Sequence, residues 1–221
     1  MNVDPTESAA GIGVLISGRG SNLQALIDAG RSGALRARIG VVIANRAGAQ
    51  GLARARAVGI ETLVIPHRGY ADREQYDRAL IDALRSRGVR LVCLAGFMRL
   101  LGPAFCEAYR SRILNVHPSL LPAFPGVDAQ RQALEHGVKV TGATVHFVTS
   151  GLDDGPIVEQ EAVPVADEDT VETLSSRILQ AEHRIYAPAV DRVLHHRWRV
   201  EGRRVLFDAA AVRGKAAEVR P

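Results

Sequence analysis

The feature that most constrains how this chain can fold is a regular alternation of short apolar runs with segments of helical periodicity. Apolar runs rich in β-branched residues predict buried strands at 11–17, 39–44, 60–65 and 89–95. Helical spacing follows each of the first three runs, and glycines end the helices predicted at 47–58 and 71–87. Repeated strand–helix units of this kind predict an α/β fold, with a parallel sheet covered by helices on both faces.

The second half of the chain is less regular. We expect short helices at 103–109 and 130–136, strands at 141–148 and 157–165, and a hairpin at 200–207 around Gly202. Residues 170–195 form one long helical pattern, which we expect to be interrupted or bent near Pro188. The predicted organisation is a single domain over 11–207, with tails at 1–10 and 208–221.

Composition and charge narrow the classes of protein that fit. The 221 residues are 47% hydrophobic and 24% charged, which is ordinary for a globular protein. The sequence has neither an apolar run of the ~18 residues that span a membrane nor the pattern of a signal peptide, so we expect a cytoplasmic protein. The two cysteines form no CxxC motif and the seven histidines lack ligand spacing, so we expect no metal. The net charge of +4 favours small anionic ligands, while the scattered arginines give little support to nucleic-acid binding, and we expect none.

A glycine-rich turn, Gly18-Arg19-Gly20-Ser21-Asn22, follows the first predicted strand and precedes a helix. Ser21 or Asn22 is suited to cap that helix. Such a turn leaves backbone N–H groups and the positive end of the helix dipole facing a bound anion such as phosphate. The dinucleotide fingerprint is incomplete, because Leu23 stands where its third glycine would be. The alternative is a tight turn whose glycines serve packing only.

The main catalytic candidates are Asn115 and His117, in the run Ile113-Leu114-Asn115-Val116-His117. Residues two apart on a strand point to the same face, and Pro118 and Pro122 end the strand. An amide donor beside a titratable ring suits a reaction that develops negative charge on a carbonyl oxygen. The alternative is that both side chains only satisfy hydrogen bonds in a turn. Catalysis is favoured because this pair, like the glycine turn, follows a strand end, where ligands of parallel sheets bind.

The loop Gly96-Phe97-Met98-Arg99-Leu100-Leu101-Gly102-Pro103 is unusually apolar. Loops are usually polar because they run over the surface. This one therefore either packs inward or lines a pocket for a flat, partly apolar ligand.

Five segments, in this order and spacing, resemble the phosphoribosylglycinamide formyltransferases, which are folate-dependent enzymes of purine biosynthesis. The segments are SGRGSNLQ at 17–24, LAGFMRLL at 94–101, NVHPSLLP at 115–122, GATVHFV at 142–148 and LDDGP at 152–156. The resemblance covers about residues 11–200. The HPSLLP segment and the Asp-x-Gly loop are specific to folate formyltransferases as a group, and the Gly-Ser-Asn turn and the chain length narrow the resemblance to this family.

The resemblance implies a Rossmann-like sheet and the transfer of a formyl group from 10-formyltetrahydrofolate to the amine of glycinamide ribonucleotide. It places the catalytic residues on Asn115, His117 and Asp153. It places the ribonucleotide on the turn Gly20, Ser21 and Asn22 and on Glu182. The folate would bind at Arg73, Met98, Arg99, Leu100, Leu101, Asn115 and Asp153. We expect these two small molecules as partners, no membrane, and a monomer or homodimer.

The sequence departs from the family pattern near the ribonucleotide. Asp128 and Gln130 stand where some members have histidines, and Leu179 and Gln180 differ from a glutamine near the phosphate in others. Methionyl-tRNA formyltransferase and formyltetrahydrofolate deformylase share the catalytic trio but carry a further C-terminal or N-terminal domain, so we expect neither. The other alternative is a non-catalytic nucleotide-binding module, which has no need of all three catalytic residues.

The implied reaction passes through a tetrahedral intermediate with an oxyanion. We hypothesise that Asn115 donates a hydrogen bond to this oxyanion, and that protonated His117 donates another or supplies a proton. Asp153 would orient His117 and help to take the proton that leaves the amine. The residues alone do not distinguish Asp153 from its neighbour Asp154, and the resemblance favours Asp153. On its alternating strand, His146 is expected to play a supporting role.

Overall fold

The computed structural model describes residues 11–208, so the predicted tails lie outside it apart from Asp208. Its strands are β1 Gly11–Ile16, β2 Arg38–Ala44, β3 Thr62–Val64, β4 Val89–Leu94, β5 Ile113–His117, β6 Val140–Phe147, β7 Ile157–Pro164, β8 Trp198–Glu201 and β9 Arg204–Phe207. Its α-helices are α1 Ser21–Ser32, α2 Gly51–Ala57, α3 Arg73–Arg85, α4 Pro103–Ala108, α5 Ala129–Glu135 and α6 Val171–His195, with a 3₁₀ turn at His67–Gly69. None of the helices in this part of the chain combines the length and the apolar character needed to cross a membrane.

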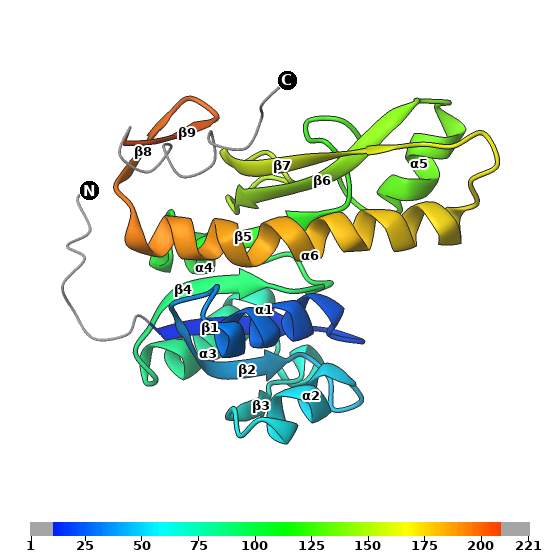
Figure 1. Ribbon diagram of the computed structural model, residues 1–221. Helices are drawn as coiled ribbons and strands as arrows, with labels where there is room; N and C mark the ends of the chain where they lie inside the picture. Colours follow the sequence, from blue (N-terminus) through cyan, green and yellow to red (C-terminus); the bar gives the residue numbers. More distant parts are fainter. Residues whose placement is uncertain (1–10, 209–221) are drawn as a thin grey trace.

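The nine strands form one sheet in the order β3-β2-β1-β4-β5-β6-β7-β9-β8 (Figure 1). Strands β1 to β5 pair in parallel, as the alternation of strands and helices predicts. The pairs β5–β6 and β6–β7 are antiparallel, and the terminal hairpin joins the sheet through one parallel pair between β7 and β9. The expected α/β fold with a mostly parallel sheet is confirmed.

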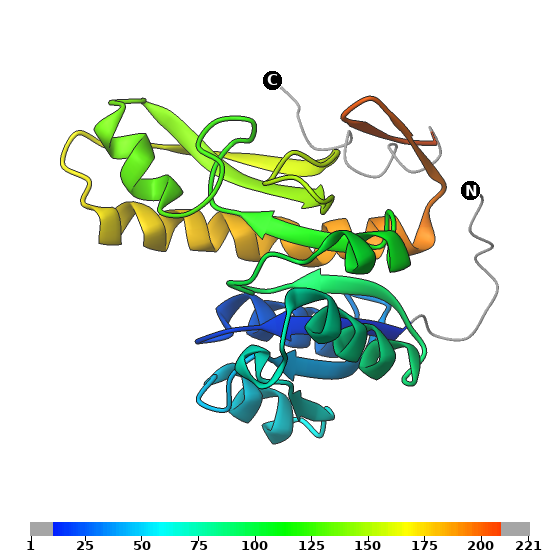
Figure 2. The same cartoon turned by 180° about the vertical axis from the view of Figure 1, so that it is seen from behind.

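Helices cover both faces of the sheet, as Figures 1 and 2 show. Alternate residues of each strand therefore enter different cores. Val14 and Val116 pack in the core on the side of α1 and α6. Leu15 and Ile113 pack in the core on the side of α3 and α4. Asn115 and His117 share the parity of Ile113, so their side chains lie on the α3 and α4 side.

Helix α6 differs from the prediction because it runs through Pro188 without interruption. Pro188 is exposed, while Ile185 and Val190 on either side of it are buried against the sheet. Proline removes one N–H from the helical ladder, and packing on both sides of it keeps this helix continuous. The Tyr186 hydroxyl lies 2.9 Å from the Leu94 carbonyl and 3.1 Å from the Leu114 carbonyl, which fixes α6 against β4 and β5.

Helix α2 is shorter than predicted and begins at Gly51 rather than at Ala47. The segment before it folds over the end of β1, where the Gly51 N–H donates to the Gly18 carbonyl at 3.1 Å. A Cβ atom at Gly51 would lie 2.7 Å from Ile16 Cδ1 and 3.2 Å from Gly20 Cα, so this close approach favours glycine.

Candidate active site

The end of β5 brings Asn115 and His117 to one face of the sheet. The antiparallel register places Asn115 opposite His146 and His117 opposite Thr144. His117 is buried and Asn115 is half-buried. The prediction that the two side chains project together is confirmed, and β6 adds a second pair of polar residues beside them.

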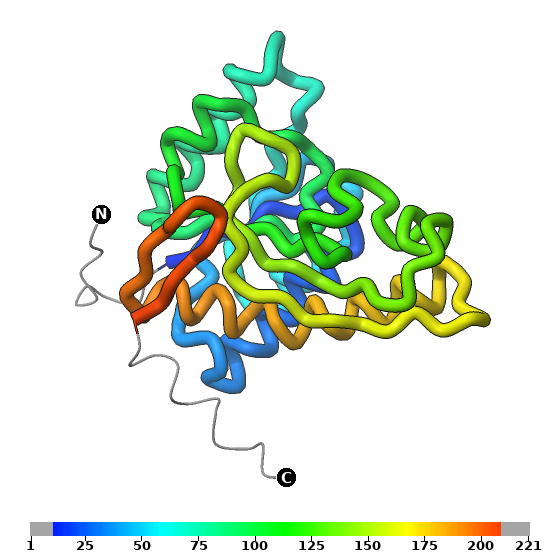
Figure 3. The backbone as a smooth tube through the Cα atoms, turned by 90° about the horizontal axis from the view of Figure 1, so that it is seen from above, coloured from blue at the N-terminus to red at the C-terminus, as the bar shows by residue number. Residues whose placement is uncertain are grey.

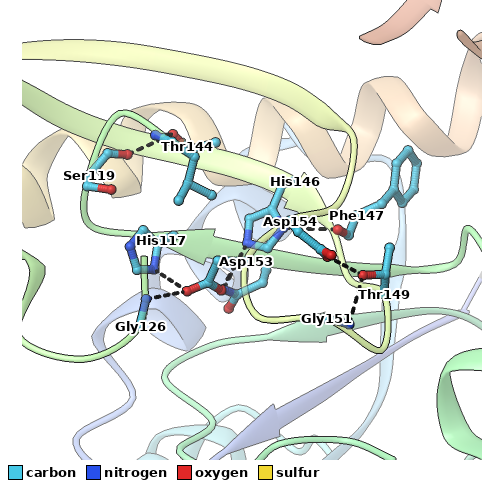
Figure 4. Close-up of polar contacts among 12 residues, drawn as sticks. His117, Ser119, Gly126, Thr144, His146, Phe147, Thr149, Gly151, Asp153 and Asp154 are labelled. Carbon is cyan, nitrogen blue, oxygen red and sulfur yellow. Dashed lines mark hydrogen bonds and ion pairs between the residues drawn. The ribbon is translucent and has the colours of Figure 1, made fainter. Parts of the chain in front are cut away.

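The loop between β6 and β7 brings the carboxylate of Asp153 to this cluster (Figure 4). Asp153 Oδ2 lies 3.3 Å from His117 Nδ1, and Asp153 Oδ1 lies 3.6 Å from His146 Nε2. The Gly126 N–H donates to Asp153 Oδ2 at 2.8 Å. The neighbouring Asp154 is exposed and accepts instead from the Thr149 hydroxyl within the turn. The structure therefore brings Asp153, and not Asp154, to His117.

The ring of His117 lies between two hydrogen-bond acceptors. Its Nε2 is 2.8 Å from the main-chain carbonyl oxygen of Phe124, and its Nδ1 faces the Asp153 carboxylate. A neutral imidazole donates from only one nitrogen, whereas the imidazolium donates from both. The protonated ring is therefore the form that satisfies both acceptors.

His146 holds the amide of Asn115. Its Nδ1 lies 2.9 Å from the Phe147 carbonyl oxygen and donates to it, which leaves Nε2 as an acceptor for the Asn115 Nδ2–H at 3.2 Å. Burial lowers the pKa of His146, against smaller opposing effects of the Phe147 carbonyl and Asp153, which favours this neutral form. One Asn115 N–H is therefore committed to His146, and the second is left for another acceptor. The sequence pointed to a supporting role for His146, but its contacts with both Asn115 and Asp153 were not predicted.

A separate cavity of about 580 Å³ lies at the carboxyl ends of β1, β4 and β5. The glycine turn at 18–22 lines one side of it, and Ser175, Leu179 and Glu182 of α6 line another. Val116 and Pro118 contribute to its wall, whereas Asn115 and His117 point to the opposite face of β5. The cavity and the polar cluster therefore meet across the end of this one strand.

Helix α1 begins at Ser21, so the expectation that Ser21 or Asn22 caps it is wrong. The cap position is Gly20, which has a φ of +73° and makes no side-chain capping bond. A Cβ atom at Gly20 would lie 2.6 Å from the Gly51 Cα, so the left-handed backbone and the close packing both favour glycine here. The Asn22 side chain turns away from the helix end and donates to Glu182 at 2.8 Å.

Glu182 is a buried carboxyl in the wall of the cavity. Burial raises its pKa to about 7, partly offset by the hydrogen bond from Asn22. The Asn22 Oδ1 atom is buried and finds no hydrogen-bond partner among residues 11–208. The pair therefore presents an unsatisfied acceptor, and at neutral pH a partly protonated carboxyl, beside the cavity.

The sequence left open whether the apolar loop after β4 packs inward or offers an apolar surface to a ligand, and the structure shows side chains of both kinds. Phe97 and Leu101 are buried in the core with α3 and α4, while Met98 is 74% exposed and Leu100 is 61% exposed. Arg99 is exposed as well. Of the four residues of this loop predicted to bind folate, Leu101 is the one whose side chain the core already covers.

The remaining sequence candidates fall at the margins of the site. Arg73 is exposed at the start of α3 and lies beside the loop, since a Cβ atom at Gly102 would come within 3.2 Å of its Cδ. Gln130 lines the cavity, and Asp128 and Gln180 are exposed. No group of three metal-binding side chains is gathered within residues 11–208.

The family model described as Formyl transferase matches residues 11–190. The chain belongs to the formyl transferase family. The family resemblance read from the sequence motifs is thereby confirmed.

Individual members of the family support the same assignment. Phosphoribosylglycinamide formyltransferase from Escherichia coli is 44% identical over 198 residues, which cover 90% of this chain and 91% of that protein. The crystal structure of glycinamide ribonucleotide transformylase 1 from Symbiobacterium toebii superposes with a TM-score of 0.88 at 56% identity, covering 90% of this chain and 93% of that one. The chain also matches the human trifunctional purine biosynthetic protein adenosine-3, at 50% identity over 184 residues, but spans only 18% of that protein's length.

Proposed function

We propose that this chain transfers the formyl group of 10-formyltetrahydrofolate to the amine of 5-phosphoribosylglycinamide, giving formylglycinamide ribonucleotide and tetrahydrofolate in purine biosynthesis. The observation that carries the proposal is the arrangement of His117 between the Asp153 carboxylate and the Phe124 carbonyl, beside the amide of Asn115. The proposal is supported by the family to which the chain belongs and by its similarity to a glycinamide ribonucleotide transformylase structure.

In the proposed reaction the substrate amine attacks the formyl carbon, so that a C–N bond forms and the formyl oxygen becomes an oxyanion. The uncommitted N–H of Asn115 donates a hydrogen bond to this oxyanion, and the positive charge of the His117 imidazolium, whose two N–H groups face Phe124 and Asp153, stabilises it electrostatically. Collapse of the intermediate breaks the bond to N10 of the folate, which leaves as tetrahydrofolate after gaining the proton that the amine has lost and that Asp153 passes on. Asp153 keeps His117 oriented and accepts the proton lost by the amine, directly or through water. The nucleophile belongs to the substrate, so the chain needs no nucleophilic serine or cysteine.

The cavity is the proposed site of the ribonucleotide. The N–H groups at the start of α1, from the turn Gly20, Ser21 and Asn22, face the phosphate. Glu182 and the unsatisfied Asn22 Oδ1 face the ribose hydroxyls, which can both donate and accept hydrogen bonds. The glycinamide arm then reaches across the end of β5 from the side of Val116 to the side of Asn115.

The folate is proposed to lie on the other side of the polar cluster, against the loop after β4. The exposed side chains of Met98 and Leu100 offer an apolar surface, and Arg99 and Arg73 carry the positive charge that carboxylates prefer. Leu101 contributes from the core, and Asn115 and Asp153 face the formyl group. The proposed partners are these two small molecules.

The experiment that tests this function measures tetrahydrofolate release from 10-formyltetrahydrofolate, with and without 5-phosphoribosylglycinamide. Release that requires the ribonucleotide, and that is lost in Asn115→Ala and His117→Ala, supports the transferase. Release without the ribonucleotide would identify a hydrolase, and no release with retained ribonucleotide binding would identify a binding module. Asp154→Asn is the matched control for Asp153→Asn, because the two carboxylates are adjacent and only Asp153 reaches His117.

A further inference from the structure

The hairpin of β8 and β9 contacts the loop that carries Asp153. Arg203 Nη2 lies 3.5 Å from the main-chain carbonyl oxygen of Asp153, a residue 50 positions earlier in the chain. The Ile157 N–H donates to the Arg203 carbonyl at 3.0 Å, which anchors the turn of the hairpin to the end of the same loop. Figure 3 shows the hairpin lying beside this loop. The family model matches only up to residue 190, so the hairpin lies beyond the matched region.

The backbone of Asp153 needs support from its surroundings. Its φ of +49° is left-handed, a conformation that costs residues with a Cβ atom free energy, although aspartate adopts it more readily than most. Such a conformation persists only where neighbouring contacts hold it. The Gly126 N–H donates a hydrogen bond to the Asp153 side chain, and the guanidinium of Arg203 faces the Asp153 main-chain carbonyl.

The positive charge of Arg203 also acts on His146. Three charged or titratable groups act electrostatically on His146: Asp153 from the β6–β7 loop, His117 from β5 and Arg203 from the hairpin. Burial is the largest cause of the lowered pKa of His146; Asp153 opposes it, while His117 and Arg203 lower the pKa further. A neutral His146 is the form that accepts the hydrogen bond from Asn115.

We propose that Arg203 is a positioning residue for formyl transfer, which holds the main chain of Asp153 against His117 and adds a positive charge to the surroundings of this cluster. Arg203 is exposed and is not placed in contact with either substrate. Its effect would therefore fall on the reaction step rather than on ribonucleotide binding, since the cavity lies on the opposite face of β5. This inference rests on the proposed function.

The first test compares Arg203→Ala with Arg204→Ala, a neighbouring exposed arginine of the same hairpin. We expect kcat to fall about tenfold in Arg203→Ala with KM for the ribonucleotide unchanged. Arg203→Lys, which keeps the charge, should recover part of this loss, and Arg204→Ala should stay within about twofold of the wild type. Equal kcat values for Arg203→Ala and Arg204→Ala would overturn the positioning role.

The second test follows the ring of His146 by NMR titration in the wild type, Arg203→Ala and Arg203→Lys. Loss of the positive charge should move the titration midpoint of His146 to higher pH, and the acidic limb of the kcat profile should move with it. An unchanged midpoint in Arg203→Ala would contradict the inference, and so would a midpoint in Arg203→Lys that moves as far as in Arg203→Ala. Arg203→Gln, which also removes the charge, replaces the alanine variant if that variant does not fold. If the wild-type chain does not transfer the formyl group, the proposed function is refuted. The NMR midpoint of His146 does not depend on activity, so it still tests whether the charge of Arg203 acts on this ring.

Discussion

The buried carboxyl of Glu182 makes the stability of this chain depend on pH in a specific direction. Burial raises its pKa from 4.5 to about 7 in the folded chain. Below pH 4.5 the group is protonated in both the folded and the unfolded states. Between pH 4.5 and about 7 the folded state keeps a proton that the unfolded state has released, so the free energy of unfolding falls as the pH rises. Because one pKa unit corresponds to about 1.4 kcal/mol, the loss amounts to about 3 kcal/mol.

Glu182→Gln removes this ionisation and keeps a side chain that accepts from Asn22. We expect the free energy of unfolding of the variant, relative to the wild type, to increase by about 3 kcal/mol between about pH 4 and about pH 8. Urea unfolding at several pH values in this window measures the difference, and the exposed Glu135→Gln serves as the control. If the difference in the free energy of unfolding between Glu182→Gln and the wild type stays constant with pH, the reasoning that this carboxyl is buried and protonated is refuted.

Three further substitutions test other parts of the structure. Asn115→Ala should lower kcat for formyl transfer by about 10²–10³ without weakening ribonucleotide binding measured by calorimetry, and an unchanged kcat would exclude the oxyanion role. Gly102→Ala should destabilise the fold by about 1–3 kcal/mol, because its Cβ would lie 2.4 Å from the carboxylate of buried Asp77; an unchanged melting temperature would contradict this. Thr170→Ala removes the side chain that caps α6 and should lower the free energy of unfolding by about 1 kcal/mol, measured by chemical denaturation. An unchanged free energy of unfolding would show that the hydrogen bond from the Thr173 N–H to Thr170 does not stabilise the helix.

Much of the fold could be predicted because local patterns and global packing agree. The apolar runs of β1 and β4 are buried on both faces, which is the environment that continuous apolar strands indicate. Prediction failed where tertiary contacts overrule a local preference. Pro188 breaks isolated helices, yet α6 continues through it because the sheet holds the helix on both sides of this residue.

The site was predictable where it depends on periodicity and unpredictable where it depends on register. Asn115 and His117 share a face because strands repeat every two residues, a property visible in the sequence. The pairing of Asn115 with His146 depends on the antiparallel register of β5 and β6, which no local pattern encodes. Asp153 rather than Asp154 reaches His117 because of the left-handed backbone at Asp153 in this loop. The two adjacent aspartates give no local indication in the sequence of which one points toward His117.

The placement of the two sites on opposite faces of β5 has a consequence for how specificity can change. Val116 and Pro118 contribute to the cavity, while Asn115 and His117 belong to the polar cluster, so under the proposed function neighbouring residues of β5 face the ribonucleotide and the reacting groups, respectively. Substitutions that reshape the cavity, at Leu179 or Gln130 for example, do not touch the cluster. If the proposed function holds, the part of the acceptor that lies in the cavity can change by mutation on one face of β5, while the residues of formyl transfer on the other face stay the same.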